Sequence, residues 1–184
     1  MKIPSEAKLV FKGIIFEVYQ WQQKMFDGST ETFEMLKRPN TIEVIATSGN
    51  KILLTHQSQP NKSDFYSLFG GRGKEGEDPL VTAKRELLEE SGLESNDWEL
   101  FKIFEPTHKI EWSIYTFIAR NCKKVSEQSL DPGEKIEIRE RTFDEFIQDV
   151  LSDKYWGDEL ILEILKMKTS GKLEEFRKKI FGTA

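Results

Sequence analysis

Three glutamates, Glu86, Glu89 and Glu90, lie close together in a segment whose apolar pattern is helical. At roughly 100° of rotation per residue they share an arc of about 100° on one helix face, and Glu86 and Glu90 are one turn apart. Clustered carboxylates raise each other's pKa unless a cation neutralises them. Their oxygens suit Mg²⁺ or Mn²⁺, which typically combine a few carboxylates with substrate phosphates. The glutamates therefore predict a site that holds a divalent cation against a phosphate.

The residues around these glutamates predict the helix that positions them. Asp78 is suited to cap its N-terminus, Pro79 is tolerated in the first turn, and Gly92 is expected as a left-handed C-cap. The apolar arc consists of Leu80, Val81, Ala83, Leu87 and Leu88. Arg85 precedes Glu89 by one turn and can fix its rotamer. A solvated acidic face is the usual explanation of a lone Glu-Glu pair, and the complete pattern argues against it here.

The segment Gly71–Leu93, GRGKEGEDPLVTAKRELLEESGL, resembles a Nudix box at every defining position. The resemblance implies the α/β class, with an α/β/α sandwich around a mixed β-sheet. It also implies Mg²⁺-dependent hydrolysis of a nucleoside diphosphate linked to another group X, with Mn²⁺ as a substitute. By resemblance, the metal is assigned to Glu77, Glu86, Glu89, Glu90 and the carbonyl of Gly70. Arg85 would orient the glutamates.

Features outside the box resemble the ADP-ribose and nucleotide-sugar pyrophosphatase branch of this family. The turn Phe26-Asp27-Gly28 and the sequence Lys37-Arg38-Pro39 are the usual opening of that branch, and Pro106 falls close to a proline associated with ADP-ribose hydrolases. Substrate binding is assigned to Arg38, Gln57, Gly71 and Arg72. In that branch the N-terminal hairpin commonly packs across a homodimer, so we expect dimerisation through Leu9–Lys37.

Two positions depart from the family pattern. Phe69 stands where a proline usually precedes Gly70, and the common arginine after Gln57 is replaced in Gln57-Ser58-Gln59-Pro60. Neither change removes a metal ligand, but both lie on the approach to the substrate. The sequence therefore does not determine the nucleobase or the X group of the substrate. Phe69, Tyr66 and Trp112 could each stack a base, although aromatic residues at such positions more often belong to the core. Arg38 could bind a phosphate, with a surface ion pair as the alternative.

The general base has two candidates. Glu134 follows the turn Asp131-Pro132-Gly133, similar to the late loop of the ADP-ribose branch, and a box glutamate such as Glu89 is the other. An exposed turn glutamate is the alternative explanation of Glu134. A base must come within hydrogen-bond distance of the attacking water, which the sequence does not show.

The composition bounds the class of protein. With 184 residues we expect one Nudix domain over 41–184 and an N-terminal β-hairpin appendage over 1–40. The net charge of −5 argues against a nucleic-acid partner, and basic residues near the C-terminus fit a solvated helix face. The chain offers no apolar run for a membrane span or signal peptide, so we expect a cytoplasmic enzyme. The single cysteine, Cys122, is expected to be a small buried residue rather than a catalytic thiol.

Hydrophobic patterning predicts the remaining elements. Strands are expected at Leu9–Gln22, Thr30–Lys37, Thr41–Ser48, Lys51–Gln57, Tyr66–Phe69, Trp98–Phe104, Ser113–Arg120 and Glu137–Arg141. Turns are expected at Phe26–Ser29 and Gly49-Asn50, and a loop at Asn61–Asp64. Helices are expected at Phe143–Leu151, Asp158–Lys168 and Leu173–Phe181, with Thr142 and Glu145 forming a capping box.

The predicted reaction is hydrolysis of ADP-ribose or a nucleotide sugar to a nucleoside monophosphate and a phosphorylated sugar. Enzymes that share the box hydrolyse diadenosine polyphosphates, nucleoside triphosphates or capped RNA, or isomerise isopentenyl diphosphate. A protein of another class would sense ADP-ribose without cleaving it, but such proteins have degenerate boxes and this box keeps every glutamate. A serine or cysteine hydrolase is disfavoured because His56 and His108 accompany no nucleophile motif.

Overall fold

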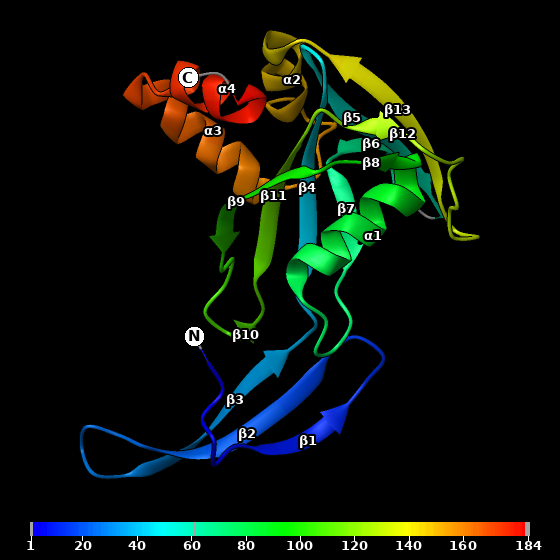
Figure 1. Ribbon diagram of the computed structural model, residues 1–184. Coiled ribbons are helices and arrows are strands. Elements are labelled where there is room, and N and C mark those ends of the chain that lie inside the picture. Colours follow the sequence, from blue (N-terminus) through cyan, green and yellow to red (C-terminus); the bar gives the residue numbers. More distant parts are fainter. Residues whose placement is uncertain (1, 61, 183–184) are drawn as a thin grey trace.

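The structure, a computed structural model, describes residues 2–60 and 62–182. Figure 1 shows a body of strands and helices from which a smaller N-terminal sheet extends. The strands are β1 (Lys8–Lys12), β2 (Glu17–Lys24), β3 (Thr30–Lys37), β4 (Thr41–Ser48), β5 (Lys51–Gln59), β6 (Lys62–Ser67), β7 (Phe69–Arg72), β8 (Leu93–Glu94), β9 (Asp97–Phe104), β10 (Ile110–Glu111), β11 (Ile114–Arg120), β12 (Lys123–Lys124) and β13 (Lys135–Arg141). The helices are α1 (Pro79–Ser91), α2 (Phe143–Val150), α3 (Asp158–Ser170) and α4 (Leu173–Phe181).

The main sheet is mixed, in the order β13-β5-β4-β11-β9, with β4 and β11 parallel. Strands β4 and β5 form a hairpin at the expected Gly49-Asn50 turn, but they pair only over 46–48 with 51–53. Beyond that point the two strands separate, and β7 pairs with β4 while β6 pairs with β5. Because β6 runs directly into β7, this opening brings the residues before the box between two central strands.

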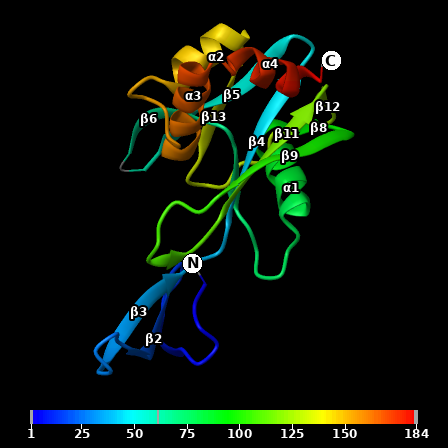
Figure 2. The same cartoon turned by 90° about the vertical axis from the view of Figure 1, so that its left-hand side faces the viewer.

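Two hydrophobic cores cover the two faces of the sheet. Helix α1 packs on one face, where Leu87 and Ala83 meet Ile42 and Val44 of β4. Helices α2, α3 and α4 pack on the other face around Ile45. In Figure 2, α1 and α3 lie on opposite sides of β4. The alternation of strand side chains between faces thus builds both cores, and the expected α/β/α sandwich is confirmed.

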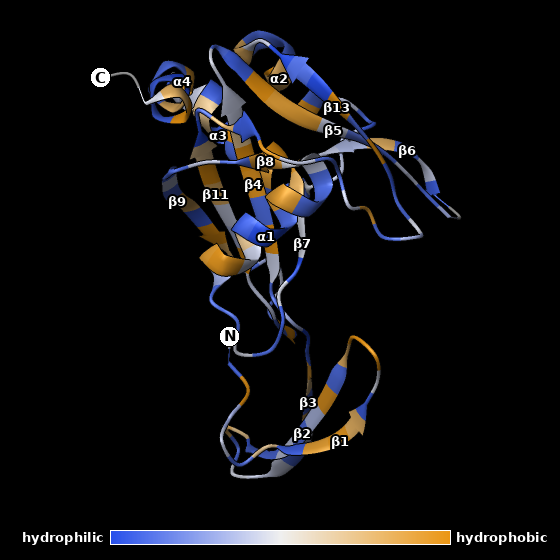
Figure 3. Ribbon diagram, turned by 45° about the vertical axis from the view of Figure 1, so that its right-hand side comes forward, coloured by the Kyte–Doolittle hydropathy of each residue, from blue (hydrophilic) through white to orange (hydrophobic). Residues whose placement is uncertain are grey.

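The N-terminal sheet differs from the single antiparallel pair that we expected. The expected strand Leu9–Gln22 is interrupted at Gly13, whose N–H donates to the carbonyl of Phe16 at 2.8 Å, and β1 folds back onto β2. The turn before β3 is as expected, with Gly28 at φ 87°. Strand β10 extends this sheet by pairing in parallel with β3. Figure 3 shows that much of β1 is hydrophobic.

Two further expectations are wrong in detail. Lys62–Asp64 belong to β6 rather than to a loop, because pairing with β5 extends past Gln57. Asn61 lies outside the described residues. On α1, Val81 is exposed, whereas Thr82 is buried in its place and makes a polar contact with the box. None of the described helices is both long and apolar enough to span a membrane.

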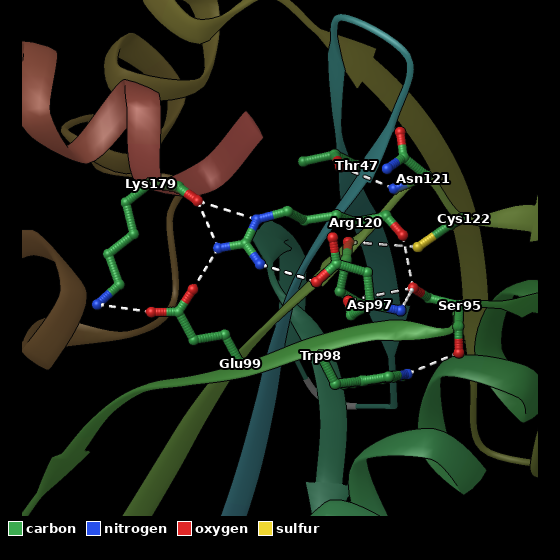
Figure 4. A network of polar contacts seen from close by, with 10 residues as sticks. Thr47, Ser95, Asp97, Trp98, Glu99, Arg120, Asn121, Cys122 and Lys179 are labelled. Atoms are coloured by element: carbon green, nitrogen blue, oxygen red, sulfur yellow. Dashed lines mark hydrogen bonds and ion pairs between the residues drawn. The ribbon is translucent and has the colours of Figure 1, made fainter. Parts of the chain in front are cut away.

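An ion cluster around the buried Arg120 joins the sheet to the last helix (Figure 4). The Arg120 side chain donates to Asp97 at 3.0 Å and also to Glu99. Its Nε and Nη2 donate to the carbonyl of Lys179 at 3.0 and 2.6 Å. Hydrogen bonds from Arg120 and then Lys179 lower the pKa of Glu99. The cluster therefore holds β9, β11 and α4 together with its charges paired.

Candidate active site

Helix α1 begins and ends where the sequence predicts. The Asp78 side chain accepts hydrogen bonds from the N–H groups of Leu80 and Val81 at 2.8 and 3.3 Å. Gly92 adopts the left-handed conformation at φ 68°, and its N–H donates to the carbonyl of Leu88 at 2.7 Å. These caps satisfy backbone groups that the helix leaves unpaired, so the register of the box glutamates is fixed locally.

Arg85 binds three of the box carboxylates. Its Nη1 lies 2.9 Å from Glu86 Oε1 and 2.9 Å from Glu89 Oε2, and its Nη2 donates to Glu77 Oε2 at 3.4 Å. The Thr82 hydroxyl donates to the same Glu77 oxygen at 2.7 Å. Glu77 therefore anchors Arg85, and Arg85 orients Glu86 and Glu89. These contacts are compatible with the orienting role that the resemblance assigns to Arg85, which stays a prediction.

Glu90 is held differently from its neighbours. Its side chain is buried, and Oε2 accepts the backbone N–H of Gly70 at 2.8 Å. Burial, followed by the charges of Glu86, Glu134 and Glu89, raises the pKa of Glu90 to about 9, against the lowering effect of the hydrogen bond from Gly70. Burial also raises the pKa of Glu86, against the lowering effect of Arg85. The box thus concentrates more negative charge around Glu86 and Glu90 than Arg85 offsets.

Strand β7 approaches β4 closely at Gly70 and α1 closely at Gly71. A Cβ on Gly70 would lie 2.0 Å from the carbonyl oxygen of Ile42, and the φ of Gly70 is 145°. A Cβ on Gly71 would lie 2.8 Å from the carboxylate of Glu86. We expected these glycines in a loop, but they are in β7, where pairing with β4 fixes their distance from the glutamates. The loop of the box begins at Gly73.

Within residues 2–60 and 62–182, no three His, Cys, Asp or Glu side chains are arranged so that they could hold a metal ion together. Arg85 partly explains why these carboxylates do not converge on one point, because it forms ion pairs with Glu86 and Glu89. The donor set still fits a hard divalent cation, since it consists of carboxylate oxygens beside a glycine backbone. Such a cation would supply the positive charge that buried Glu90 lacks.

The structure brings Glu134 to the box. The turn Asp131–Glu134 is closed by a hydrogen bond from the Glu134 N–H to the Asp131 carbonyl at 2.9 Å. Its charge acts on both Glu86 and Glu90, although more than 40 residues separate it from them in the sequence. Glu134 is half-buried rather than fully exposed. The geometry is therefore compatible with Glu134 as a base, and its role stays a prediction.

The four residues assigned to the substrate line one cleft of about 890 Å³: Arg38, Gln57, Gly71 and Arg72. The cleft occupies the opening between β4 and β5 and also contains Gly70 and Trp112. The guanidinium of Arg38 lies 4.5 Å from the Trp112 ring centroid. Arg38 makes no ion pair within the described part of the chain, so the surface ion pair considered for it is wrong. Burial, followed by the charge of Arg72, lowers the pKa of Arg38.

A second cleft of about 720 Å³ separates the N-terminal sheet from the start of the box. Its walls include Ile14 and Ile15 of the β1–β2 turn and the loop 73–78. Arg38 lines both clefts. The N-terminal sheet therefore forms part of the approach to the box, and Glu77 of the box lines this second cleft, although Glu86, Glu89 and Glu90 line neither cleft.

Two groups in the substrate cleft were missed by sequence reasoning. The Lys62 ammonium lies 3.5 Å from the Phe65 ring centroid and 3.3 Å from that of Trp156. Glu43, in the middle of β4, also lines the cleft, and burial raises its pKa to about 7. A charged residue in an otherwise apolar strand was the available signal for Glu43. Lys62 gave none, because its partners come together only through tertiary contacts.

Other candidate residues have structural roles. Phe69 is fully buried, so its core explanation is confirmed, whereas Trp112 lines the cleft. Tyr66 is half-buried and packs against the ring of His56, with centroids 5.1 Å apart. Cys122 is buried as expected, and burial raises its pKa to about 11, which disfavours a reactive thiolate.

Comparison with known proteins decides the family. A model of the NUDIX domain matches residues 37–162, more than half of the chain. The chain belongs to the Nudix family. A methanol dehydrogenase activator from Bacillus methanolicus is 28% identical over 163 residues, which cover 86% of this chain and 88% of that relative. An ADP-ribose pyrophosphatase from Bacillus subtilis strain 168 is 26% identical over 143 residues, or 76% and 77% of the two chains.

Solved structures agree with this Nudix assignment at the level of fold. An ADP compounds hydrolase has a TM-score of 0.71 at 17% identity, covering 91% of this chain and 95% of that chain. A NUDIX hydrolase from Nitrosomonas europaea has a TM-score of 0.57 at 19% identity, covering 73% and 90%. The expectation of an enzyme of the Nudix pyrophosphatase type is confirmed by the family model together with these relatives.

Proposed function

We propose that this Nudix enzyme hydrolyses the diphosphate bond of ADP-ribose or a nucleotide sugar in a Mg²⁺-dependent reaction. The products would be a nucleoside monophosphate and a phosphorylated sugar. The observation that carries the proposal is the buried, undercompensated carboxylate pair Glu86 and Glu90 beside Gly70, at the edge of a cleft with two arginines. The names of the B. subtilis relative and of the structural neighbour support an ADP-containing substrate.

Separate groups of residues would hold the metal and bind the diphosphate. Glu86, Glu89, Glu90 and the Gly70 carbonyl would hold Mg²⁺, or Mn²⁺ in its place. When bound, the metal supplies Lewis acidity that polarises phosphoryl oxygens and acidifies a water. In the cleft, Arg38 and Arg72 would bind the anionic diphosphate through charge-assisted hydrogen bonds. Arg85 would keep Glu89 and Glu86 aligned through the contacts at 2.9 Å.

Glu134 or a box glutamate would act as the general base that removes a proton from the attacking water. Glu134 is supported by its electrostatic contact with Glu86 and Glu90 and by its place in an exposed turn. A positioned base typically contributes about 10²- to 10⁴-fold to the rate. A loss of kcat of that size in Glu134→Gln, with KM unchanged, would assign the base to Glu134. A change of less than about threefold would leave it to the box.

The deciding test is product analysis on a substrate panel, with Mg²⁺ and with EDTA. The panel holds ADP-ribose, ADP-glucose, UDP- and GDP-sugars, NADH, diadenosine polyphosphates and oxidised nucleoside triphosphates. Metal-dependent release of a nucleoside monophosphate from ADP-ribose or a nucleotide sugar supports the proposal. Cleavage of only triphosphates or diadenosine compounds would keep the chemistry and overturn the substrate class. Binding without turnover would favour a sensor.

We further propose that residues 1–40 form an appendage that dimerises the protein. The proposal is supported by apolar side chains that the N-terminal sheet leaves exposed: Leu9, Val10, Phe11, Ile14, Ile15, Phe16 and Phe26. Ile14 is 98% exposed, which is unusual for an isoleucine unless a partner covers it. Because the β1–β2 turn also lines the second cleft, dimerisation would influence substrate binding.

Light scattering on Phe11→Glu tests the dimer. A charge placed in an apolar interface is strongly unfavourable, so we expect a monomer with a raised KM. The matched control is Val125→Glu, which changes a similarly exposed residue distant from the N-terminal sheet and should leave a dimer. A monomeric wild-type protein at micromolar concentration would contradict the proposal.

A further inference from the structure

One end of the substrate cleft is acidic, and nothing in the box explains it. Glu43, Tyr155 and Glu159 all line this part of the cleft, which we call the acidic end. The charge of Glu159 acts on Glu43, and the charges of both act on the hydroxyl of Tyr155. Arg38, which lines the same cleft, has its pKa lowered by burial and then by the charge of Arg72. The cleft thus combines two arginines, which favour anions, with two glutamates, which disfavour them.

Glu43 has no structural reason to be a carboxylate. Glu159 lies in the first turn of α3, where acidic residues are favoured by the helix dipole. Glu43 lies within β4, where it pairs with Gly70 across the strands and is flanked by the buried Ile42 and Val44. An isolated carboxylate is unfavourable in such a place, because burial disfavours its charge. Stability alone would favour an apolar residue there.

The hydrogen bonds of the acidic end are incomplete. Glu43 Oε2 accepts the Thr116 hydroxyl at 3.1 Å, and in the described part of the chain no basic group lies within ion-pair distance of Glu43. Tyr155 is only 8% exposed, yet its hydroxyl makes no hydrogen bond to any described residue. A half-buried carboxylate and a tyrosine hydroxyl without a hydrogen bond, both lining the same cleft, are suited to a ligand that brings its own hydrogen-bond donors.

We propose that the acidic end binds the hydroxyl groups of an uncharged sugar, so that the enzyme selects nucleotide sugars whose X group carries no negative charge. This inference rests on the proposed function and specifies its substrate class. Hydroxyl groups donate to Glu43 and exchange hydrogen bonds with the Tyr155 hydroxyl, which can donate or accept. A carboxylate or a phosphate on X would meet Glu43 and Glu159 in a site of low solvent access, where repulsion is only weakly screened.

The test compares two substrates that differ only in charge at the sugar, ADP-glucose and ADP-glucuronate. A repulsion strong enough to shift a pKa by about one unit corresponds to a tenfold change in an equilibrium constant. We therefore expect wild-type kcat/KM to favour ADP-glucose by about tenfold or more. In Glu43→Gln this ratio should fall by at least about threefold, mostly through KM, while kcat on ADP-glucose changes little. Glu140→Gln, the same change on an exposed residue of β13, should keep the wild-type ratio.

Tyr155→Phe provides a second variant that removes only the hydroxyl. It should raise KM for ADP-glucose by about threefold to tenfold, as expected for the loss of one hydrogen bond. A ratio in Glu43→Gln equal to that of wild type, in a folded protein, would overturn the inference while leaving diphosphate hydrolysis in place. Isothermal titration of both sugars in EDTA decides the same question if wild type turns over neither. Equal affinities would overturn the inference, and absent turnover would separately overturn the proposed function.

Discussion

The box and the Arg120 cluster both gather an arginine with several carboxylates, but their charges are balanced differently. Arg120 meets Asp97, Glu99 and a helix carbonyl, and the pKa of Glu99 is lowered. In the box, Arg85 contacts three carboxylates and does not reach Glu90, whose pKa is raised to about 9. One cluster lowers the energy of its charged form, and the other leaves a charge that the protein itself does not stabilise.

This difference separates a structural site from a binding site. A paired cluster such as that of Arg120 holds elements together and needs no ligand. A cluster with excess buried carboxylate is unfavourable in the free protein and becomes favourable when a cation binds. We infer that the excess around Glu86 and Glu90 serves function. The experiments below test this contrast, beginning with the largest expected effect.

Glu90→Gln should give the largest effect, and this effect should be on activity rather than on the fold. We expect kcat to fall by about 10³-fold or more, because a neutral amide cannot balance a cation at the reacting diphosphate. That loss corresponds to about 4 kcal/mol of transition-state stabilisation. Steady-state kinetics with Mg²⁺ measures it, and urea unfolding serves as the fold control. Near-normal turnover would refute the metal assignment.

Arg120→Leu should give the converse result. The Lys179 carbonyl would lose its donors and Glu99 one of its two cationic partners, while Asp97 and Glu99 stay partly solvated. We expect the free energy of unfolding to fall by about 2–4 kcal/mol, with kcat/KM unchanged below the transition. Arg139→Leu is the matched control, because it removes an exposed pair with Glu137 worth at most about 1 kcal/mol. Equal losses in the two variants would remove the contrast.

Gly71→Ala should disturb the box with little effect on the fold. The added methyl group would lie 2.8 Å from the Glu86 carboxylate and displace it. A displacement of about 1 Å can cost about 100-fold, so we expect kcat to fall by about 10- to 100-fold. In Gly133→Ala the methyl group would meet no atom within 4 Å, and activity should be retained. Equal activity of the two variants would count against a precise position for Glu86.

The smallest expected effect is the pH dependence of stability without metal. Because the folded protein raises the pKa of Glu90, it binds more protons than the unfolded chain between the ordinary glutamate value and about 9. Stability in EDTA should therefore decrease as pH rises through this window, by at most about 1.4 kcal/mol per pH unit from this group. Thermal unfolding at several pH values measures the slope. Glu90→Gln should flatten it, and an unchanged slope would contradict the charge deficit.

Local patterns and tertiary contacts determined what the sequence could reveal. The ends of α1 and the common face of its glutamates follow from caps and helical periodicity within one segment. Gln57 and Arg72 come from two strands and Arg38 from the segment after β3, and the family resemblance supplied what periodicity could not. That resemblance did not extend to the acidic end. There Tyr155 is positioned beside β6 by a hydrogen bond from the Trp156 N–H to the Tyr66 carbonyl, a contact that sequence does not predict.

The most direct test of the contrast between the two clusters is a titration of Mn²⁺ followed by electron paramagnetic resonance, in the absence of substrate. Wild type and Arg120→Leu should bind Mn²⁺ alike, because the Arg120 cluster has no charge deficit. Glu90→Gln should bind at least about tenfold more weakly, since loss of one charged ligand costs more than 1.4 kcal/mol. Equal Mn²⁺ affinity in wild type and Glu90→Gln would contradict the account, because the buried carboxylate would then serve no cation.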